Sequence, residues 1–340
     1  MSSLNKTLEI KTSPHIARGV STDMIMRNVV YALIPVSIFA VYAFGLSALL
    51  VLITAVVSCV LTEHLLCVLT HKQSTVGDWS ITITGLLFGL TLPPNFPLWM
   101  VFFGGVIAVA LGKFIFGGLG YNTFNPALVG RAVLQASFPV AITTWQPAFS
   151  TDRFSTIASS TLTFPFMEPV YDTVSGATPL SVMKFEHIAA KTSDLFMGLT
   201  TGSSGETSAL LILLGGAYLV YRKMMNWRIP ASIFLSVAIL SGILHTINSQ
   251  YPAPDFMLLS GGLMLGAVFM ATDMVASPIT PIGVWIYGAL IGTMIVVIRV
   301  WGGLPEGVMY AILFANAFSP QIDNLIRPRV YGTSSRWSRT

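Results

Sequence analysis

Ten apolar runs divide this chain, and they constrain its fold more than any other feature. The hydrocarbon core of a bilayer is about 30 Å thick, so a helix that crosses it needs about 20 apolar residues. Most of the runs approach or reach this length, whereas 79–92 and 123–138 are among the shorter ones, and we expect them to form broken or tilted helices. The runs lie at residues 26–44, 46–70, 79–92, 97–117, 123–138, 207–221, 229–247, 256–272, 281–300 and 304–321.

The composition favours a membrane protein. Charged residues make up 9% and hydrophobic residues 54% of the 340 residues, against roughly a quarter and a half in ordinary globular domains. Residues 1–25 are polar and mixed and do not resemble a signal peptide, so we expect the first span to stay in the mature protein. The chain lacks the basic and aromatic pattern of a nucleic-acid binder, a Walker motif and a dinucleotide-binding glycine motif. We therefore predict an all-α polytopic membrane protein with about ten transmembrane helices and no nucleic-acid partner.

The positions of Lys and Arg predict the orientation of the chain. Cytoplasmic loops of membrane proteins carry an excess of these residues. If the N-terminus is inside, the side opposite to the cytoplasm holds only Arg153, Lys184 and Lys191, all in the long segment 139–206. We therefore expect a bacterial inner-membrane protein with both termini in the cytoplasm and one long periplasmic loop.

Two short matches indicate an internal repeat. Gly-Leu-Leu-Phe-Gly at 85–89 is similar to Gly-Leu-Met-Leu-Gly at 262–266, and Gly-Gly-Leu occurs at 117–119 and at 302–304. Each match relates spans that are five apart, and an odd separation gives halves of opposite orientation. We therefore predict two inverted five-helix repeats with broken helices. The expected cytoplasmic segment, first repeat, periplasmic loop, second repeat and cytoplasmic tail are residues 1–25, 26–138, 139–206, 207–322 and 323–340.

One motif in the long polar segment points to chemistry. It is Asp-Thr-Val-Ser-Gly-Ala-Thr-Pro at 172–179. Gly176 permits backbone angles that other residues avoid, Ala177 adds little bulk, and Pro179 biases Thr178 towards an extended conformation. We expect a presented hydroxyl at Thr178 and space for a ligand near the backbone. The alternative is a surface turn, because Ser, Gly and Pro are common in turns.

Polar residues also occur where lipid is expected, and such residues need a partner or a function. Asn122 and Asn125 precede Pro126, which can start a half-helix, and Arg131 follows in the same run. Free N–H groups at a helix start favour an anionic or electron-rich guest, so a cavity here could hold a flavin, a quinone head group or a cation. A re-entrant turn satisfied by the Asn side chains is the alternative. Asp273 fits either a cation site or a helix cap.

Four potential metal ligands lie on the second run. Cys59, Glu63, Cys67 and His71 are spaced by four, which brings successive side chains near one helix face. This face rotates along the helix, and His71 falls where the helix leaves the membrane. We therefore predict polar pairing of these residues and no metal site.

Three stretches carry a resemblance to a known family. The pattern at 172–178 resembles the flavinylation motif of membrane flavoproteins from two related respiratory complexes. Together with Gly-Tyr-Asn-Thr-Phe-Asn-Pro-Ala-Leu-Val-Gly-Arg-Ala at 120–132 and Met-Ala-Thr-Asp at 270–273, it is similar to the D-type membrane flavoproteins of ion-translocating Rnf (Rsx) electron-transport complexes. The B-type flavoprotein of the Na⁺-translocating NADH:quinone oxidoreductase is a relative, but it usually has a longer N-terminal extension.

The resemblance implies an electron-carrying subunit of a ferredoxin:NAD oxidoreductase complex that moves Na⁺ or H⁺. FMN would be bound through a phosphoester to Thr178, and a flavin transferase would recognise Asp172, Ser175, Gly176 and Ala177. The implied partners are the other Rnf subunits, of the A, B, C, E and G types. A second, non-covalent flavin such as riboflavin is also compatible with the family, and no catalytic residue is expected in this chain.

A small-solute channel or permease is the alternative from another class. An inverted repeat and polar residues at membrane depth suit a permease as well. The motif around Thr178 separates the two hypotheses, because a permease has no need of a flavin-attachment sequence in an extracytoplasmic loop.

Overall fold

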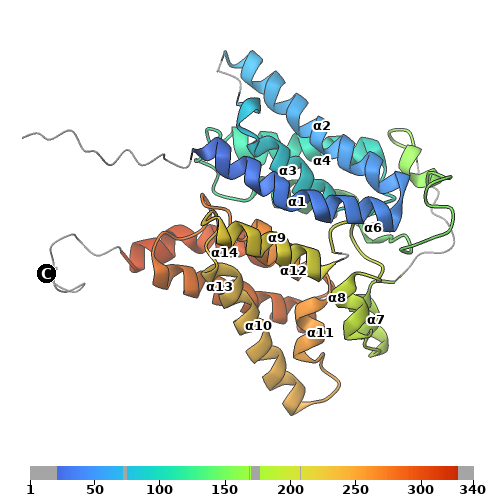
Figure 1. Cartoon of the computed structure of the whole chain (residues 1–340), viewed down its shortest axis with the longest axis vertical. Helices are drawn as coiled ribbons and strands as arrows, with labels where there is room; N and C mark the ends of the chain where they lie inside the picture. The colour runs from blue at the N-terminus through green and yellow to red at the C-terminus, as the bar shows by residue number, and fades with distance from the viewer. Residues whose placement is uncertain (1–20, 72–74, 168, 170–176, 207, 328–340) are drawn as a thin grey trace, which may run out of the picture.

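The computed structural model describes residues 21–71, 75–167, 169, 177–206 and 208–327. Within these ranges the regular elements are helices, and they form two groups that lie one above the other in Figure 1. The first group contains α1 (Thr22–Phe44), α2 (Leu46–Leu69), α3 (Ser80–Leu90), α4 (Leu98–Val109), α5 (Pro126–Ser137) and α6 (Pro139–Thr143). The second group contains α9 (Ala209–Tyr221), α10 (Arg228–Ile247), α11 (Pro254–Leu259), α12 (Leu263–Leu265), α13 (Pro281–Trp301) and α14 (Val308–Leu325).

Shorter elements complete the architecture. Two helices between the groups, α7 (Pro179–Glu186) and α8 (Thr192–Met197), lie at one end of the molecule (Figure 1). Single π-helical turns extend α4 and α12, and 3₁₀ turns precede α3 and follow α6. These are η2 (Ala110–Phe114), η4 (Gly266–Met270), η1 (Val76–Asp78) and η3 (Ser159–Leu162).

Helices coincide with all ten apolar runs, so the all-helical prediction is confirmed within the described residues. Four helices are long and apolar enough to cross a membrane, namely α1, α2, α10 and α13. Three shorter apolar helices occupy 80–90, 98–114 and 209–221. These features fit a multi-pass membrane protein, while the number of ten spans and the inverted repeat stay predictions.

The clearest break in a helix is not where we expected it. Runs 79–92 and 123–138 form α3 and α5, which are short but unbroken. The break instead divides run 256–272, where α11 stops at Leu259 and Gly261 adopts a positive φ of 63°. A residue without Cβ is favoured at that angle, so the break occurs at the glycine pair. Short length therefore did not indicate a break in α3 or α5, and their tilt stays a prediction.

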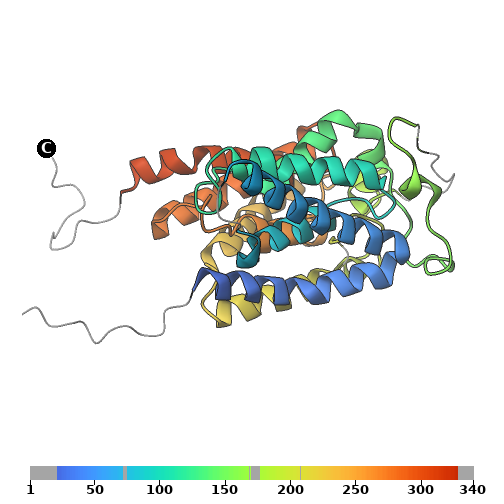
Figure 2. The ribbon, with the colours of Figure 1, turned by 90° about the horizontal axis from the view of Figure 1, so that it is seen from above.

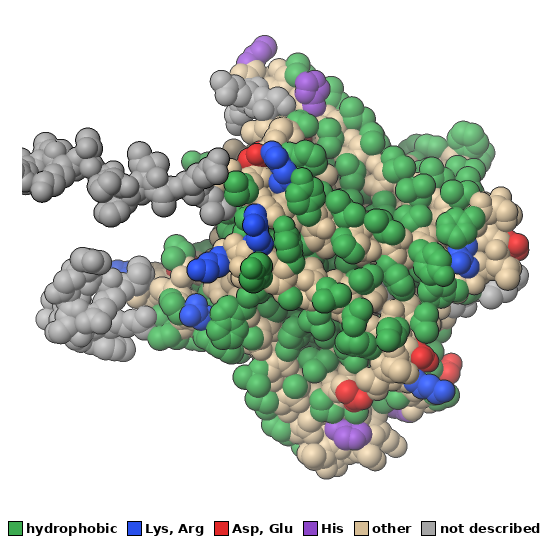
Figure 3. All heavy atoms as spheres, in the orientation of Figure 1, with side chains coloured by type: hydrophobic (Ala, Val, Ile, Leu, Met, Phe, Trp, Pro, Cys, Tyr) green, Lys and Arg blue, Asp and Glu red, His purple; other side chains and the backbone are tan. Residues whose placement is uncertain are grey.

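The two ends of the described chain lie together. In Figures 1 and 2 the start of α1 and the end of α14 are at the left, and segment 139–206 is at the right. This segment carries α6, η3, α7 and α8, so it is more structured than the predicted loop. Hydrophobic side chains cover the middle of the face in Figure 3, and several Lys and Arg side chains gather towards its left end. The arrangement suits the predicted orientation, which stays a prediction.

Small residues allow α10 and α13 to pack closely. A Cβ added to Gly288 would lie 2.5 Å from the Cβ of Ser232, and one added to Gly292 would lie 1.9 Å from the Oγ of Ser236. The Ser232 hydroxyl also donates a 2.6 Å hydrogen bond to the carbonyl of Trp285. Facing rows of small residues are the common way for helices to associate in lipid, where burial of apolar surface from water gives no driving force.

A buried ion pair joins α2 to the end of α4. The Nζ of Lys113 lies 2.7 Å from Oε1 of Glu63 and donates a 2.8 Å hydrogen bond to the Ser80 hydroxyl. The side chains of Lys113 and Glu63 are 5% and 3% exposed, and the Thr75 hydroxyl donates to the same Glu63 oxygen. The predicted polar pairing is thus confirmed for Glu63.

We expect Gly292→Ala to destabilise the protein. Its new Cβ would meet Ser236 and the carbonyl of Ile233, and such overpacking typically costs about 1–3 kcal/mol. Gly242→Ala on α10 is the matched control, because its Cβ would meet only Pro254, at 3.6 Å. Thermal unfolding of the purified protein in detergent should show a lower Tm for Gly292→Ala alone. Equal Tm values would contradict the close packing of α10 and α13.

We also expect Lys113→Met to be strongly destabilising. It leaves Glu63 buried without its cationic partner, which typically costs about 3–5 kcal/mol. The double variant Glu63→Gln with Lys113→Met removes both charges and should recover part of the loss. A double-mutant cycle of Tm measurements tests this. Strictly additive effects of the two substitutions would show that the pair does not interact.

Candidate functional site

Thr178 begins helix α7. Its backbone is extended, with φ −72° and ψ 150°, and its Oγ accepts a 3.3 Å hydrogen bond from the backbone N–H of Ser181. The hydroxyls of Thr178 and Ser181 also lie 2.8 Å apart. Pro179 occupies the first helical position, where its missing N–H costs nothing. A Thr cap followed by Pro is a strong local signal for a helix start.

The Thr178 hydroxyl is not presented to solvent as we expected. The residue is only 3% exposed, because a capping side chain turns back onto the first turn of its helix. Ala177 is exposed. The other predicted motif residues, Asp172, Ser175 and Gly176, lie outside the described residues.

Apolar contacts hold α7 against the second group of helices. Leu180 and Met183 on its inner face are buried together with Leu195 of α8 and Phe256 of α11. The capping threonine therefore sits on a helix that is packed against α11, close to the break between α11 and α12.

A lysine near the end of α7 adds a polar contact to the same group. The Nζ of Lys184 donates hydrogen bonds to the carbonyls of Gly302 and Leu304, the second at 3.1 Å, in the connection between α13 and α14. Partial burial lowers the pKa of Lys184. The position of α7 is thus set by both an apolar face and a lysine.

A narrow pocket connects Thr178 to an acidic residue. Thr178, Leu180, Gly202, Gly261 and Glu206 are among the residues that line it. Glu206 belongs to the connection between α8 and α9. The pocket therefore places a carboxyl group next to the predicted flavin-attachment residue.

Arg131 lies in a second, deeper pocket. Its Nη2 is 2.6 Å from Oε2 of Glu306, and Glu206 and Ser203 line the same pocket. Glu206 and Glu306 were not among the predicted site residues. Each lies at the edge of an apolar run, and an acidic residue at such a position was the signal that could have revealed them.

The other predicted polar residues meet across the two groups of helices. Nδ2 of Asn122 donates a 3.2 Å hydrogen bond to Oδ2 of Asp273, whose Oδ1 accepts a 3.1 Å bond from the N–H of Val275. Asn125 caps α5 and donates a 3.2 Å hydrogen bond to the carbonyl of Met270. The predicted helix start at Asn125 is confirmed. Asp273 accepts its bond within a turn and caps no helix of the described residues, because α13 begins later with Thr280 as its cap.

These residues line a cavity of about 130 Å³. Asn122, Asn125, Asp273 and Lys113 supply polar groups, and the hydroxyl residues Ser80, Thr84 and Thr272 line the cavity as well. Apolar residues of α1, α3, α5, α9 and η4 and of the segments between helices form the rest of the wall. They are Ile25, Met26, Val29, Ile83, Leu87, Leu119, Pro126, Leu219, Met224, Met225, Phe269, Met274 and Val275. An apolar cavity with a few convergent polar groups is typical of a small-molecule site.

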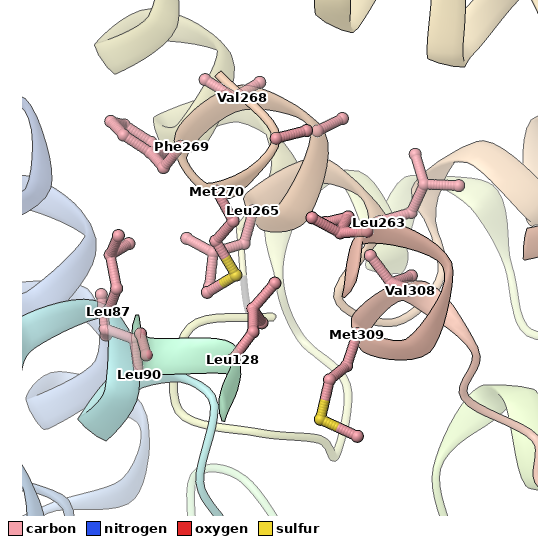
Figure 4. Close-up of a cluster of buried hydrophobic side chains, with 14 of the residues drawn as sticks. Leu87, Leu90, Leu128, Leu263, Leu265, Val268, Phe269, Met270, Val308 and Met309 are labelled. Atoms are coloured by element: carbon pink, nitrogen blue, oxygen red, sulfur yellow. The ribbon is translucent and has the colours of Figure 1, made fainter. Parts of the chain in front are cut away.

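An apolar cluster separates this cavity from the pocket of Arg131 (Figure 4). Leu87 and Phe269 line the cavity, whereas Leu128, Leu265 and Met270 line the pocket. Arg131 is therefore apart from Asn122, Asn125 and Asp273, although it follows the two asparagines closely in the sequence. The predicted group of four residues is divided between two sites.

Comparisons with known proteins identify the family. The model of the NQR2, RnfD, RnfE family matches residues 9–332. The chain is 41% identical over 338 residues to the D subunit of the Na(+)-translocating ferredoxin:NAD(+) oxidoreductase complex of Acetobacterium woodii, which covers 98% of each chain. It is 40% identical over 335 residues to the D subunit of the proton-translocating ferredoxin:NAD(+) oxidoreductase complex of Clostridium ljungdahlii, covering 95% of this chain and 96% of the relative.

A third relative extends the pattern. The chain is 35% identical over 352 aligned positions to the D subunit of the ion-translocating oxidoreductase complex of Actinobacillus succinogenes, covering 96% of this chain and 99% of the relative. The similarity spans nearly the whole length of each protein, including both groups of helices and the segment between them. The chain therefore belongs to the NQR2, RnfD, RnfE family.

Proposed function

We propose that this protein is the membrane-embedded D-type component of an ion-translocating ferredoxin:NAD oxidoreductase (Rnf) complex and carries electrons through FMN bound covalently to Thr178. The observation that carries the proposal is the near-full-length similarity to proteins named as the D subunits of such complexes. Its partners would be the other Rnf subunits in a bacterial inner membrane. The B-type flavoprotein of the Na⁺-translocating NADH:quinone oxidoreductase is the alternative within the same family.

The residues around Thr178 suit a phosphoester. The Oγ of Thr178 lies at the N-terminus of α7, next to the N–H and the hydroxyl of Ser181. Helix N-termini favour negative charge, because their N–H groups are free and the helix dipole is positive there. Thr178 and Ser181 would hold the phosphate, and the flavin would supply the electron-carrying chemistry.

Attachment requires the Thr178 hydroxyl to leave its cap. The residue is 3% exposed, so a transferase cannot reach the oxygen in the arrangement described above. We infer that FMN is attached while the first turn of α7 is open. The transferase would recognise Asp172, Ser175, Gly176 and Ala177 in the preceding motif.

The cavity of Asn122, Asn125 and Asp273 supports a second site. Its apolar walls suit a flat aromatic ring, and its amides can bind the polar edge of that ring. We propose a non-covalent flavin such as riboflavin as the occupant. A permease would also need a polar cavity, but the relatives named for oxidoreductase complexes favour the redox role.

We propose Na⁺ or H⁺ as the transported ion. The two relatives above are named for different ions, yet they match this chain at 41% and 40% identity. Coupling in either case would depend on groups near the flavins, because an added electron in a low-dielectric region is stabilised by a nearby cation.

Thr178→Ala should abolish covalent flavin. Without the hydroxyl no phosphoester can form, so in-gel fluorescence of the denatured protein should be lost. Thr192→Ala is the matched control, since Thr192 lies at the start of α8 in the same segment and its hydroxyl contacts only Asp255 among the described residues. Its fluorescence should equal that of wild type. Fluorescence that survives in Thr178→Ala would place the flavin elsewhere.

Asn125→Leu should reduce the non-covalent flavin. The substitution removes the amide from the cavity and the hydrogen bond to Met270 that joins the two groups of helices. Flavin released by acid from the purified complex, separated by chromatography, should fall at least several-fold, while the covalent fluorescence remains. Asn248→Leu, at the end of α10 and away from the cavity, should release as much flavin as wild type. Unchanged release in Asn125→Leu would exclude this cavity as the site.

A further inference from the structure

We propose that the carboxyl group of Glu206 is a proton-binding site that takes up a proton when an electron enters the flavin on Thr178. This inference rests on the proposed function, because it needs a flavin at Thr178. It assigns a role to a residue outside the predicted flavin motif and outside the cavity of Asn122 and Asn125.

The carboxyl group of Glu206 lies in a confined space next to Thr178. Both residues line the same narrow pocket. A Cβ on Gly202 would lie 3.2 Å from one carboxylate oxygen of Glu206, and a Cβ on Gly262 would lie 3.1 Å from the other. The two glycines therefore leave space that the carboxyl group fills, and any larger residue would crowd it.

The connection that carries Glu206 is fixed to α3. The N–H of Gly205 donates a 2.7 Å hydrogen bond to the carbonyl of Leu90, and the N–H of Ser204 donates a 3.2 Å bond to that of Leu92. A Cβ on Gly205 would lie only 2.8 Å from Leu90. Glu206 is thus held between the two groups of helices, and its position does not depend on an exposed loop.

Two arginines interact electrostatically with Glu206, and each also has another partner. Arg131 of α5 is paired with Glu306, at 2.6 Å. Arg299 of α13 donates to the carbonyls of Met257 and Ser260, at 2.7 and 2.9 Å.

Hydroxyl groups also lie around this carboxyl. Tyr310 of α14 lines the same pocket as Glu206 and Arg131. Ser203 is buried and lines this pocket as well, and its influence on Glu206 favours the charged form of the carboxyl.

Electrostatics favours the neutral form of Glu206. Burial, and then the nearby charge of Glu306, raise the pKa of Glu206 to about 7, against the opposing effects of Arg131 and Ser203. An anionic phosphate and a reduced flavin at Thr178 would add negative charge beside the same pocket. Negative charge near a carboxyl group raises its pKa further, so reduction favours proton binding.

The step balances in electrons and protons. A one-electron donor of the flavin or iron–sulfur class in the complex is oxidised as the flavin on Thr178 is reduced. One proton from water then binds the Glu206 carboxylate and forms an O–H bond. When the electron leaves to the next acceptor, this O–H bond breaks and the proton is released.

The first measurement needs no flavin. Infrared difference spectra of the complex with Thr178→Ala, recorded from pH 5 to pH 9, follow the carbonyl stretch of protonated carboxylic acids. We expect a band that is half lost near pH 7 and is absent when Glu206→Gln is added. Glu206→Asp keeps a carboxyl group and should therefore retain a band. This variant shows that loss of the band in Glu206→Gln is due to the missing carboxyl group and not to misfolding. Titration of this band at the ordinary Glu value of about 4.3 would overturn the proposal.

The second measurement uses the flavin-loaded complex at pH 8. Reduction with dithionite should produce a carboxylic-acid band in wild type and in Asp255→Asn, whose carboxyl lies on α11 and bonds to Thr192. The band should be missing in Glu206→Gln. A wild-type spectrum without this band, or a band that survives in Glu206→Gln, would overturn the coupling. Loss of covalent fluorescence in the wild type would instead reject the flavin at Thr178, and with it the coupling, while the first titration still reports on Glu206 alone.

Discussion

The carbonyl groups freed where α11 ends must be satisfied, and Arg299 does this. Its guanidinium donates to the carbonyl of Met257 in α11 and to that of Ser260, the residue that follows the end of α11. A helix interrupted away from water leaves unpaired carbonyls that cost several kcal/mol each. Because one side chain of α13 satisfies these groups, the glycine turn at 260–262 can persist inside the second group of helices. That turn contacts α7 and the pocket of Thr178, so the predicted flavin site depends on Arg299.

Polar contacts between the two groups of helices create two separate sites from one interface. Asn122 and Asn125 bond to the segment at and after the end of η4, whereas Arg131 pairs with Glu306 before α14. Apolar side chains fill the space between these contacts (Figure 4). One site thus has a cavity with amide groups, and the other has a charged pocket that shares Glu206 with the pocket of Thr178.

The sequence predicted elements better than it predicted contacts. The apolar runs located the helices because hydrophobicity and length are local properties. Asn125-Pro126 predicted the start of α5, because Asn is a good helix cap and Pro suits the first helical position. The position of the helix break was not predictable from run length, since it depends on Gly261 and on Arg299, which is distant in sequence. The burial of Thr178 was missed for a related reason, because a motif does not show whether its hydroxyl faces solvent or caps a helix. Glu206 could be assigned to the site only from the three-dimensional structure, in which its carboxylate oxygens lie beside Gly202 and Gly262.

Peptide mass spectrometry tests the central claim most directly. The complex is purified from cells with and without an active flavin transferase, and the peptide that contains Thr178 is isolated after digestion. The account predicts that this peptide gains the mass of FMN less one water only when the transferase is present, and that fragmentation places the addition on Thr178. An unmodified peptide from cells with active transferase, or an FMN adduct on a different residue, would contradict it.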